Sequence, residues 1–143
     1  MGSADPKSRG AVLVVDDDED LRSEVRDVLE AEGYIVLEAD NGRGALSILR
    51  GLATIANLKK RSNHDLRLVI LDLLMPRMTG WEVIEVLRRD PQLSHIPVLV
   101  TSGLPVHGDA SGIGATMYWL RKPFGEEELL AAMDAALGHA LAS

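Results

Sequence analysis

The stretch LVILDLLMPRMTGW (residues 68–81) indicates how this chain folds. It lies across the end of a mostly apolar run at residues 66–71, which is typical of a strand covered on both faces. A single acid, Asp72, closes the run, and a helical pattern follows over residues 81–89 until Pro91, whose ring cannot continue a helix. A buried strand followed by a helix is the repeating unit of a parallel α/β sheet.

The same unit recurs on both sides of this stretch. Short apolar runs predict four further strands over residues 11–15, 34–37, 97–101 and 118–120. Apolar residues at helical spacing predict helices from Leu21 to a stop at Gly33, from Ala45 onward, and over residues 126–141. Strand and helix alternate five times, which predicts an α/β, doubly wound fold with helices on both faces of a parallel sheet.

The composition is that of one folded domain. The 143 residues include 46% hydrophobic and 26% charged residues, which suits a single apolar core. The net charge of -7 argues against nucleic acid as a ligand, and no apolar run reaches the roughly 18–20 residues that cross a membrane. There is no cysteine, which excludes disulfides and thiolate chemistry. We therefore expect a cytoplasmic location, with no nucleic-acid or membrane partner.

The ends of the chain lie outside the repeating pattern. Gly2 and Ser3 are typical of a purification tag, so residues 1–9 are expected to be a tag remnant and a flexible N-terminus. Residues 10–140 are expected to form the domain, with no output domain in the chain.

Polar side chains stand where the predicted strands end. Asp16 and Asp17 follow the first strand, Asp72 the third and Ser102 the fourth, while Lys122 follows the fifth. In a parallel sheet these ends meet at one edge, where ligands bind in folds of this kind. Three carboxylates in one pocket repel each other, and Mg²⁺, which prefers oxygen ligands, would relieve that repulsion.

This set of groups also suits phosphoryl transfer. A carboxylate can accept a phosphoryl group covalently and needs no general base, because it is already ionised at neutral pH. The ammonium of Lys122 and the hydroxyl of Ser102 can hold the remaining phosphoryl oxygens as their charge changes. The residues therefore predict a magnesium-dependent switch that is phosphorylated on Asp72.

Four segments carry a resemblance to a known family. The segments LVVDDDEDLR, LVILDLLMPRMTGWEVI, IPVLVTSG and LRKPF resemble the signature segments of bacterial two-component response-regulator receiver domains, similar to single-domain chemotaxis regulators. The resemblance covers residues 11–137. It implies a flavodoxin-like sheet with strand order 2-1-3-4-5, and a sensor histidine kinase or histidine phosphotransfer protein as the phosphoryl donor. A downstream partner protein, which the sequence does not identify, would receive the signal.

The same resemblance assigns a role to each site residue. It makes Asp72 the phosphoacceptor, Lys122 the conserved lysine and Ser102 the switch hydroxyl. Mg²⁺ would be bound by Asp17 and Asp72 directly, by Asp16 through water, and by the backbone carbonyl of Leu74. A cis bond is expected before Pro123. The aromatic switch position is ambiguous between Tyr118 and Trp119, with one inserted residue as a bulge, and we prefer Trp119 because its spacing to Lys122 matches the family.

The chain departs from the family pattern in two further places. Residues 45–72 are longer than in a compact receiver, and their apolar rhythm predicts an extended second helix before a polar loop at residues 62–64. The segment 104–114, where the fourth helix of a receiver lies, contains Pro105 and three glycines. Such residues are poor helix formers, so we expect a short, irregular helix there.

Two other interpretations remain beside the phosphoacceptor switch. The chain could be an interaction module with a receiver fold that does not depend on phosphorylation, as the irregular segment 104–114 suggests. It could also be a receiver cut from a longer regulator or hybrid kinase. An enzyme acting on a separate substrate ranks last, because Leu73 and Leu74 beside the acceptor cannot act as an acid or a base.

Overall fold

The computed structural model describes residues 9–59, 66–75, 77–103 and 117–142. Five parallel strands form one sheet in the order β2-β1-β3-β4-β5. This confirms the predicted strand order. The strands are β1 (Ala11–Val15), β2 (Ile35–Ala39), β3 (Leu66–Asp72), β4 (Val98–Ser102) and β5 (Met117–Arg121). The helices are α1 (Glu19–Ala31), α2 (Gly42–Lys59), α3 (Gly80–Arg89) and α4 (Glu126–Ala142).

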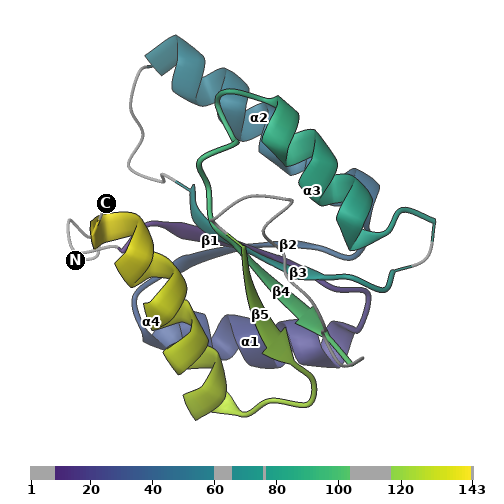
Figure 1. Cartoon of the computed structure of the whole chain (residues 1–143), viewed down its shortest axis with the longest axis vertical. Coiled ribbons are helices and arrows are strands. Elements are labelled where there is room, and N and C mark those ends of the chain that lie inside the picture. The colour runs from purple at the N-terminus through teal and green to yellow at the C-terminus, as the bar shows by residue number, and fades with distance from the viewer. Residues whose placement is uncertain (1–8, 60–65, 76, 104–116, 143) are drawn as a thin grey trace.

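Helices cover both faces of the sheet, with α1 and α4 on one face and α2 and α3 on the other (Figure 1). Successive strand side chains point to opposite faces, so alternate residues enter different cores. In β1, Leu13 and Val15 pack towards α2 and α3, whereas Val12 and Val14 pack towards α1 and α4. Because both faces are covered, all five residues of β1 are buried, which explains its uninterrupted apolar sequence.

Several element boundaries differ by a few residues from the sequence prediction. β2 begins at Ile35, because the N–H of Tyr34 donates to the carbonyl of Leu29 and closes the end of α1. α2 begins at Gly42, because the side chain of Asn41 accepts from the N–H of Gly44 at 2.8 Å and so starts the helix. The remaining differences are one or two residues at the ends of elements; β2 extends to Ala39 and α1 begins at Glu19.

The two expected departures from a compact receiver have different outcomes. α2 has 18 residues, which confirms the extended second helix. The loop at 62–64, the irregular helix at 104–114 and residues 1–8 lie outside the described residues, so Figure 1 gives the label α4 to the last helix of the chain. Among the described residues, no helix has both the length and the apolar character needed to cross a bilayer.

Candidate functional site

Two acids lie in the loop that leaves β1. The N–H of Asp16 still donates to the carbonyl of Ala39 on β2, at 3.1 Å. The helix α1 is capped by Asp18, whose side chain accepts from the N–H groups of Asp20 and Leu21, at 3.0 and 3.2 Å. Capping therefore does not account for Asp16, which is buried, or for Asp17, which is exposed.

The predicted acceptor lies at the centre of the sheet edge. Asp72 is the last residue of β3, which lies between β1 and β4, and it is 4% exposed. Its Oδ1 accepts from the N–H of Leu74 at 3.3 Å. The start of α3 lies close behind it, since a Cβ added to Gly80 would be 2.7 Å from the carbonyl oxygen of Asp72. Glycine is the residue that allows this close approach of two backbones.

The three predicted carboxylates and the lysine come together. One carboxylate oxygen from each of Asp16, Asp17 and Asp72 lies within 4.8 Å of the others. The Nζ of Lys122 donates to Oδ2 of Asp16 at 2.8 Å and lies 3.5 Å from Oδ2 of Asp72. The second oxygen of Asp16 accepts from the N–H of Asp18 at 2.9 Å. Three stretches that are distant in the sequence therefore form one charged pocket, with three acids and one ammonium.

The charges in this pocket alter two pKa values. Burial, and then the negative charge of Asp16, raise the pKa of Asp72 above its ordinary value, although Lys122 opposes this change. Burial alone would lower the pKa of Lys122, but its hydrogen bond to Asp16 and the charges of Asp16 and Asp72 outweigh it and raise that pKa. Lys122 is therefore held as an ammonium, while the ionised form of Asp72 is disfavoured.

This donor set fits a hard divalent cation. All three side chains offer carboxylate oxygens, which are the ligands that Mg²⁺ prefers, and one of them, Asp17, is open to solvent. A cation that keeps several waters needs such an open side.

The structure gives fewer contacts for the other predicted site residues, Ser102 and Leu74. Ser102 is buried at the end of β4, beside β3, and its carbonyl accepts from the N–H of Lys122 at 2.8 Å. The bond between Lys122 and Pro123 is cis, as expected. The part that the Leu74 carbonyl plays in metal binding stays a prediction.

The two candidate aromatic residues lie on opposite faces of β5. Trp119 packs against the core below α2 and α3, and its ring lies 5.8 Å from that of Trp81 on α3. Tyr118 packs towards α1 and α4. The pairing of β5 with β4 is regular over Met117–Arg121, so the expected bulge does not lie within this strand. The role of Trp119 in switching stays a prediction.

The sequence of this chain matches a known protein family. Residues 12–134 match the model of the response regulator receiver domain. The chain belongs to the response regulator receiver family. Over 137 residues it is 30% identical to the polar-differentiation response regulator DivK of Brucella anthropi, an alignment that covers 94% of this chain and 99% of that protein.

Two solved structures support the same assignment. The chemotaxis protein CheY4 of Vibrio cholerae is 31% identical, with a TM-score of 0.71 over 90% of this chain and 98% of that one. The signal receiver domain of a signal transduction histidine kinase from Syntrophus aciditrophicus is 26% identical, with a TM-score of 0.67 over 91% of each chain. This receiver therefore has the acidic triad typical of a receiver Mg²⁺ site, together with Lys122, and it is a phosphoacceptor rather than an enzyme acting on a separate substrate. A receiver implies a kinase or phosphotransfer partner.

Sequence reasoning missed two features of this receiver site. It did not identify Gly80, although a glycine directly after the capping residue Thr79 gave a signal, because glycine is a poor helix former. It also missed Arg22 and its partner Glu38, for which the sequence carries no local signal, because the two residues lie on different elements 16 positions apart.

Proposed function

We propose that this receiver takes a phosphoryl group on Asp72 from the phosphohistidine of a sensor kinase or phosphotransfer protein, with Mg²⁺ as the cofactor. The observation that carries the proposal is the pocket itself. Lys122 contacts Asp16 and Asp72 together, and the oxygens of Asp16, Asp17 and Asp72 lie within 4.8 Å of one another. A phosphoryl group on Asp72 would lie among these charges.

The transfer balances without a general base. A carboxylate oxygen of Asp72 attacks phosphorus, forming the P–O bond of an acyl phosphate while the P–N bond of the donor breaks. The imidazole nitrogen keeps the electron pair of that bond and takes its proton from solvent. Lys122, already held as an ammonium, can shift from the carboxylate of Asp72 to a phosphoryl oxygen, because it lies 3.5 Å from Oδ2 of Asp72.

The acids of the pocket would hold the metal. Asp17, Asp72 and the carbonyl of Leu74 would bind it directly, and Asp16 would act through water. When bound, Mg²⁺ neutralises the negative charge that gathers between acceptor and phosphoryl oxygens. Asp16 has both oxygens engaged, by Asp18 and Lys122, which suits an indirect role.

Phosphorylation would then change a surface that a partner protein binds. The hydroxyl of Ser102 would bind a phosphoryl oxygen, and β4 and β5 would carry the change to Trp119, which is paired with Val100 in the sheet. Such a switch works by shifting an equilibrium between two arrangements, since the phosphoryl group contacts one of them better.

The direct test is phosphorylation of purified protein. With Mg²⁺ and a small donor such as acetyl phosphate, the wild-type chain should gain the mass of one phosphoryl group. The Asp72→Asn variant should gain none, and the control Asp134→Asn, which changes an exposed acid on α4, should behave as wild type. Equal labelling of the Asp72→Asn variant would reject the assignment of the acceptor.

Magnesium titration separates this function from the alternatives. A receiver-fold module that does not depend on phosphorylation has no need of a metal site, whereas the proposed switch should show saturable Mg²⁺ binding through the fluorescence of Trp81 and Trp119. The similarity to a receiver domain of a histidine kinase supports the third interpretation, in which this receiver is part of a longer regulator or hybrid kinase. The biochemistry of the pocket would be the same in that case.

A further inference from the structure

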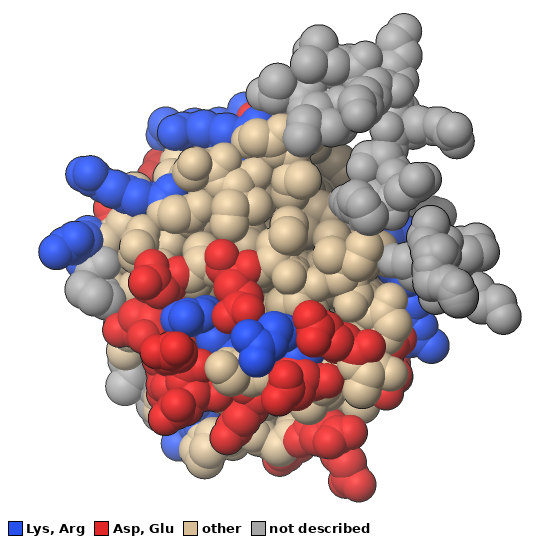
Figure 2. Space-filling view, turned by 180° about the vertical axis from the view of Figure 1, so that it is seen from behind, with Lys and Arg blue, Asp and Glu red and all other residues tan. Residues whose placement is uncertain are grey.

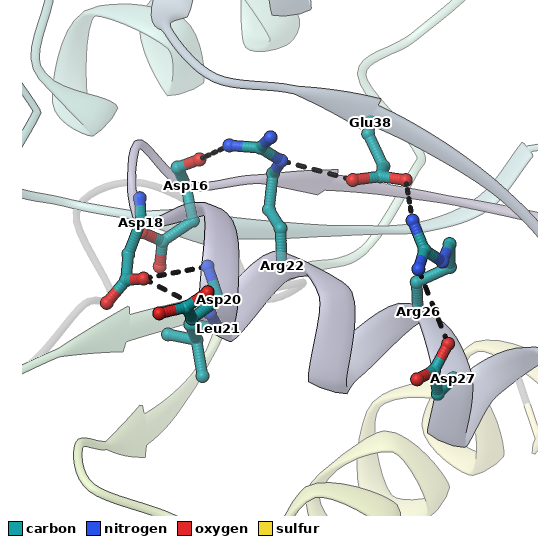
Figure 3. A network of polar contacts seen from close by, with 8 residues as sticks. All are labelled: Asp16, Asp18, Asp20, Leu21, Arg22, Arg26, Asp27 and Glu38. Carbon is teal, nitrogen blue, oxygen red and sulfur yellow. Dashed lines mark hydrogen bonds and ion pairs between the residues drawn. The ribbon is translucent and has the colours of Figure 1, made fainter.

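Arg22 on α1 contacts the backbone of the loop that carries Asp16 and Asp17 (Figure 3). The Nη1 of Arg22, on α1, donates to the backbone carbonyl of Asp16 at 2.8 Å. The Nε of the same guanidinium donates to Oε1 of Glu38 on β2, at 3.1 Å. Arg22 therefore links the end of β1 to the neighbouring strand β2, and neither contact involves a carboxylate of the metal pocket.

The ion pair between Arg22 and Glu38 is partly buried, and Glu38 also contacts Arg26. The side chain of Arg22 is 15% exposed and that of Glu38 is 28% exposed. The other oxygen of Glu38 accepts from Nη1 of Arg26 at 3.1 Å, one helical turn along α1. Glu38 is thus held between two arginines, and only Arg22 among these three residues has a described contact with Asp16.

Figure 2 shows the charged side chains on the face opposite to that of Figure 1. Acidic side chains gather over its lower part, where α1 lies, and basic side chains are set among them. On such a surface, arginines and acids form many exposed ion pairs of small energetic value. Arg22 differs from those pairs because its guanidinium is largely buried and bonds the backbone.

The two contacts on Asp16 fix its backbone. Its N–H donates to the carbonyl of Ala39, and its C=O accepts from Arg22. The carbonyl of Asp16 belongs to the planar peptide group that leads into Asp17. Holding this carbonyl therefore sets the plane of that peptide and the position of the Cα atom of Asp17, from which its exposed side chain leaves the loop.

We propose that Arg22 is a positioning residue for the metal site, which orients Asp17 through the carbonyl of Asp16 and is itself oriented by Glu38. The inference rests on the proposed binding of Mg²⁺ by Asp17. Groups that orient metal ligands without touching the metal commonly change its affinity by about 10- to 100-fold. Arginine suits the role because its rigid plane fixes the angle between its two partners, whereas lysine offers one rotating ammonium.

The experiment compares Arg22→Met with Arg26→Met. Both variants remove one arginine from α1 and one ion pair from Glu38, but only the first removes the contact with Asp16. We expect Arg22→Met to weaken Mg²⁺ binding about 10-fold or more, measured by calorimetry, with Arg26→Met close to wild type. Arg22→Lys, which keeps the positive charge, should recover part of the loss.

A second measurement needs no metal. In metal-free protein, the backbone amides of Asp17 and Asp18 should show greater mobility by ¹⁵N relaxation in Arg22→Met than in Arg26→Met. Glu38→Gln should give a smaller change in the same direction, because its amide oxygen still accepts from Arg22. These amides report the order of the loop directly, whereas a general loss of stability would loosen other parts of the chain as well.

The outcomes separate this inference from the proposed function. If the wild-type chain binds no Mg²⁺, the proposed function fails, while the relaxation data still test whether Arg22 orders the loop. Unchanged Mg²⁺ affinity and unchanged loop mobility in a folded Arg22→Met variant would overturn the inference. An equal loss of affinity in both methionine variants would also overturn it, since the effect would then come from the ion pairs with Glu38.

Discussion

Replacing Asp72 by Asn should stabilise the metal-free protein. Asp72 is 4% exposed and shares its pocket with Asp16 and Asp17. Asparagine has the same shape, keeps an oxygen that can accept from the N–H of Leu74, and leaves the contact between Lys122 and Asp16 in place. The substitution therefore removes one buried charge with little change in packing.

The size of the effect follows from the distances. At an effective dielectric constant near 20, the 3.5 Å contact with Lys122 is worth about 5 kcal/mol to an ionised Asp72. At a separation of 4.8 Å, each of the other two acids repels that charge by about 3.5 kcal/mol, and the exposed Asp17 by less. Attraction and repulsion nearly cancel, which leaves the cost of burying the carboxylate. We expect the variant to be more stable by about 1–2 kcal/mol, or about 3–7 °C in Tm.

The pH dependence of this difference has a definite sign. Burial and Asp16 raise the pKa of Asp72 in the folded state above its ordinary value of 3.8. The folded protein then keeps a proton at a pH where the unfolded chain has lost it, so the stability of the wild type falls as pH rises between the two values. The advantage of Asp72→Asn should be complete above the folded-state pKa and should vanish as the pH falls to 3.8.

The assay is denaturant unfolding of both proteins with chelator and with Mg²⁺, at matched ionic strength and at several pH values. A cation at 100 times its Kd stabilises the protein that binds it by about 2.7 kcal/mol. Wild type should gain more than Asp72→Asn, so the order of the two stabilities should reverse. A variant that is less stable than wild type in chelator at pH 7 would refute the electrostatic reasoning. Equal stabilisation of both by Mg²⁺ would refute the assignment of Asp72 as a ligand.

Four further predictions concern single substitutions at Gly80, Gly51, Leu74 and Trp81. Gly80→Ala should cost about 1–3 kcal/mol in unfolding, because its Cβ would lie 2.7 Å from backbone. Gly51→Ala, in open space on α2, should instead stabilise by about 1 kcal/mol. Leu74→Asn should shorten the lifetime of the phosphorylated state, followed by mass over time, because the amide can hold a water beside the acceptor; an unchanged lifetime would contradict this. Trp81→Phe should alter the fluorescence response of Trp119 to phosphorylation, since the rings lie 5.8 Å apart; an identical response would show that the rings are uncoupled.

The order of the elements could be predicted because this sheet is buried on both faces. Continuous apolar runs such as residues 11–15 and 68–71 can be satisfied in few ways other than a covered parallel strand. The ends of the helices were less predictable, since they depend on single hydrogen bonds. Asn41 starts α2 three residues early through its contact with Gly44, and short loops often contain such residues without starting a helix.

The acids and the lysine of the site could be predicted for a related reason. Strand order alone brings the ends of β1, β3 and β5 to one edge, so Asp16, Asp72 and Lys122 needed no side-chain detail to be placed together. Arg22 could not be found in this way, because its role depends on which atom of Asp16 it binds. The sequence would equally allow an ion pair with a carboxylate of the loop, whereas the structure shows a bond to the carbonyl.

The balance of charge in the pocket explains why the site can act as a switch. Three acids face one ammonium, and burial together with the charge of Asp16 raises the pKa of Asp72, so the ionised form of Asp72 is disfavoured when no cation is bound. A bound cation would remove that penalty, and a phosphoryl group would then add negative charge next to Lys122 and the end of β4. Each step changes which groups Lys122 must neutralise, and β5, which precedes that lysine, carries Trp119. The buried carboxylate of Asp72 is therefore expected both to lower the stability of the metal-free protein and to couple the occupancy of the pocket to the region around Trp119 on β5.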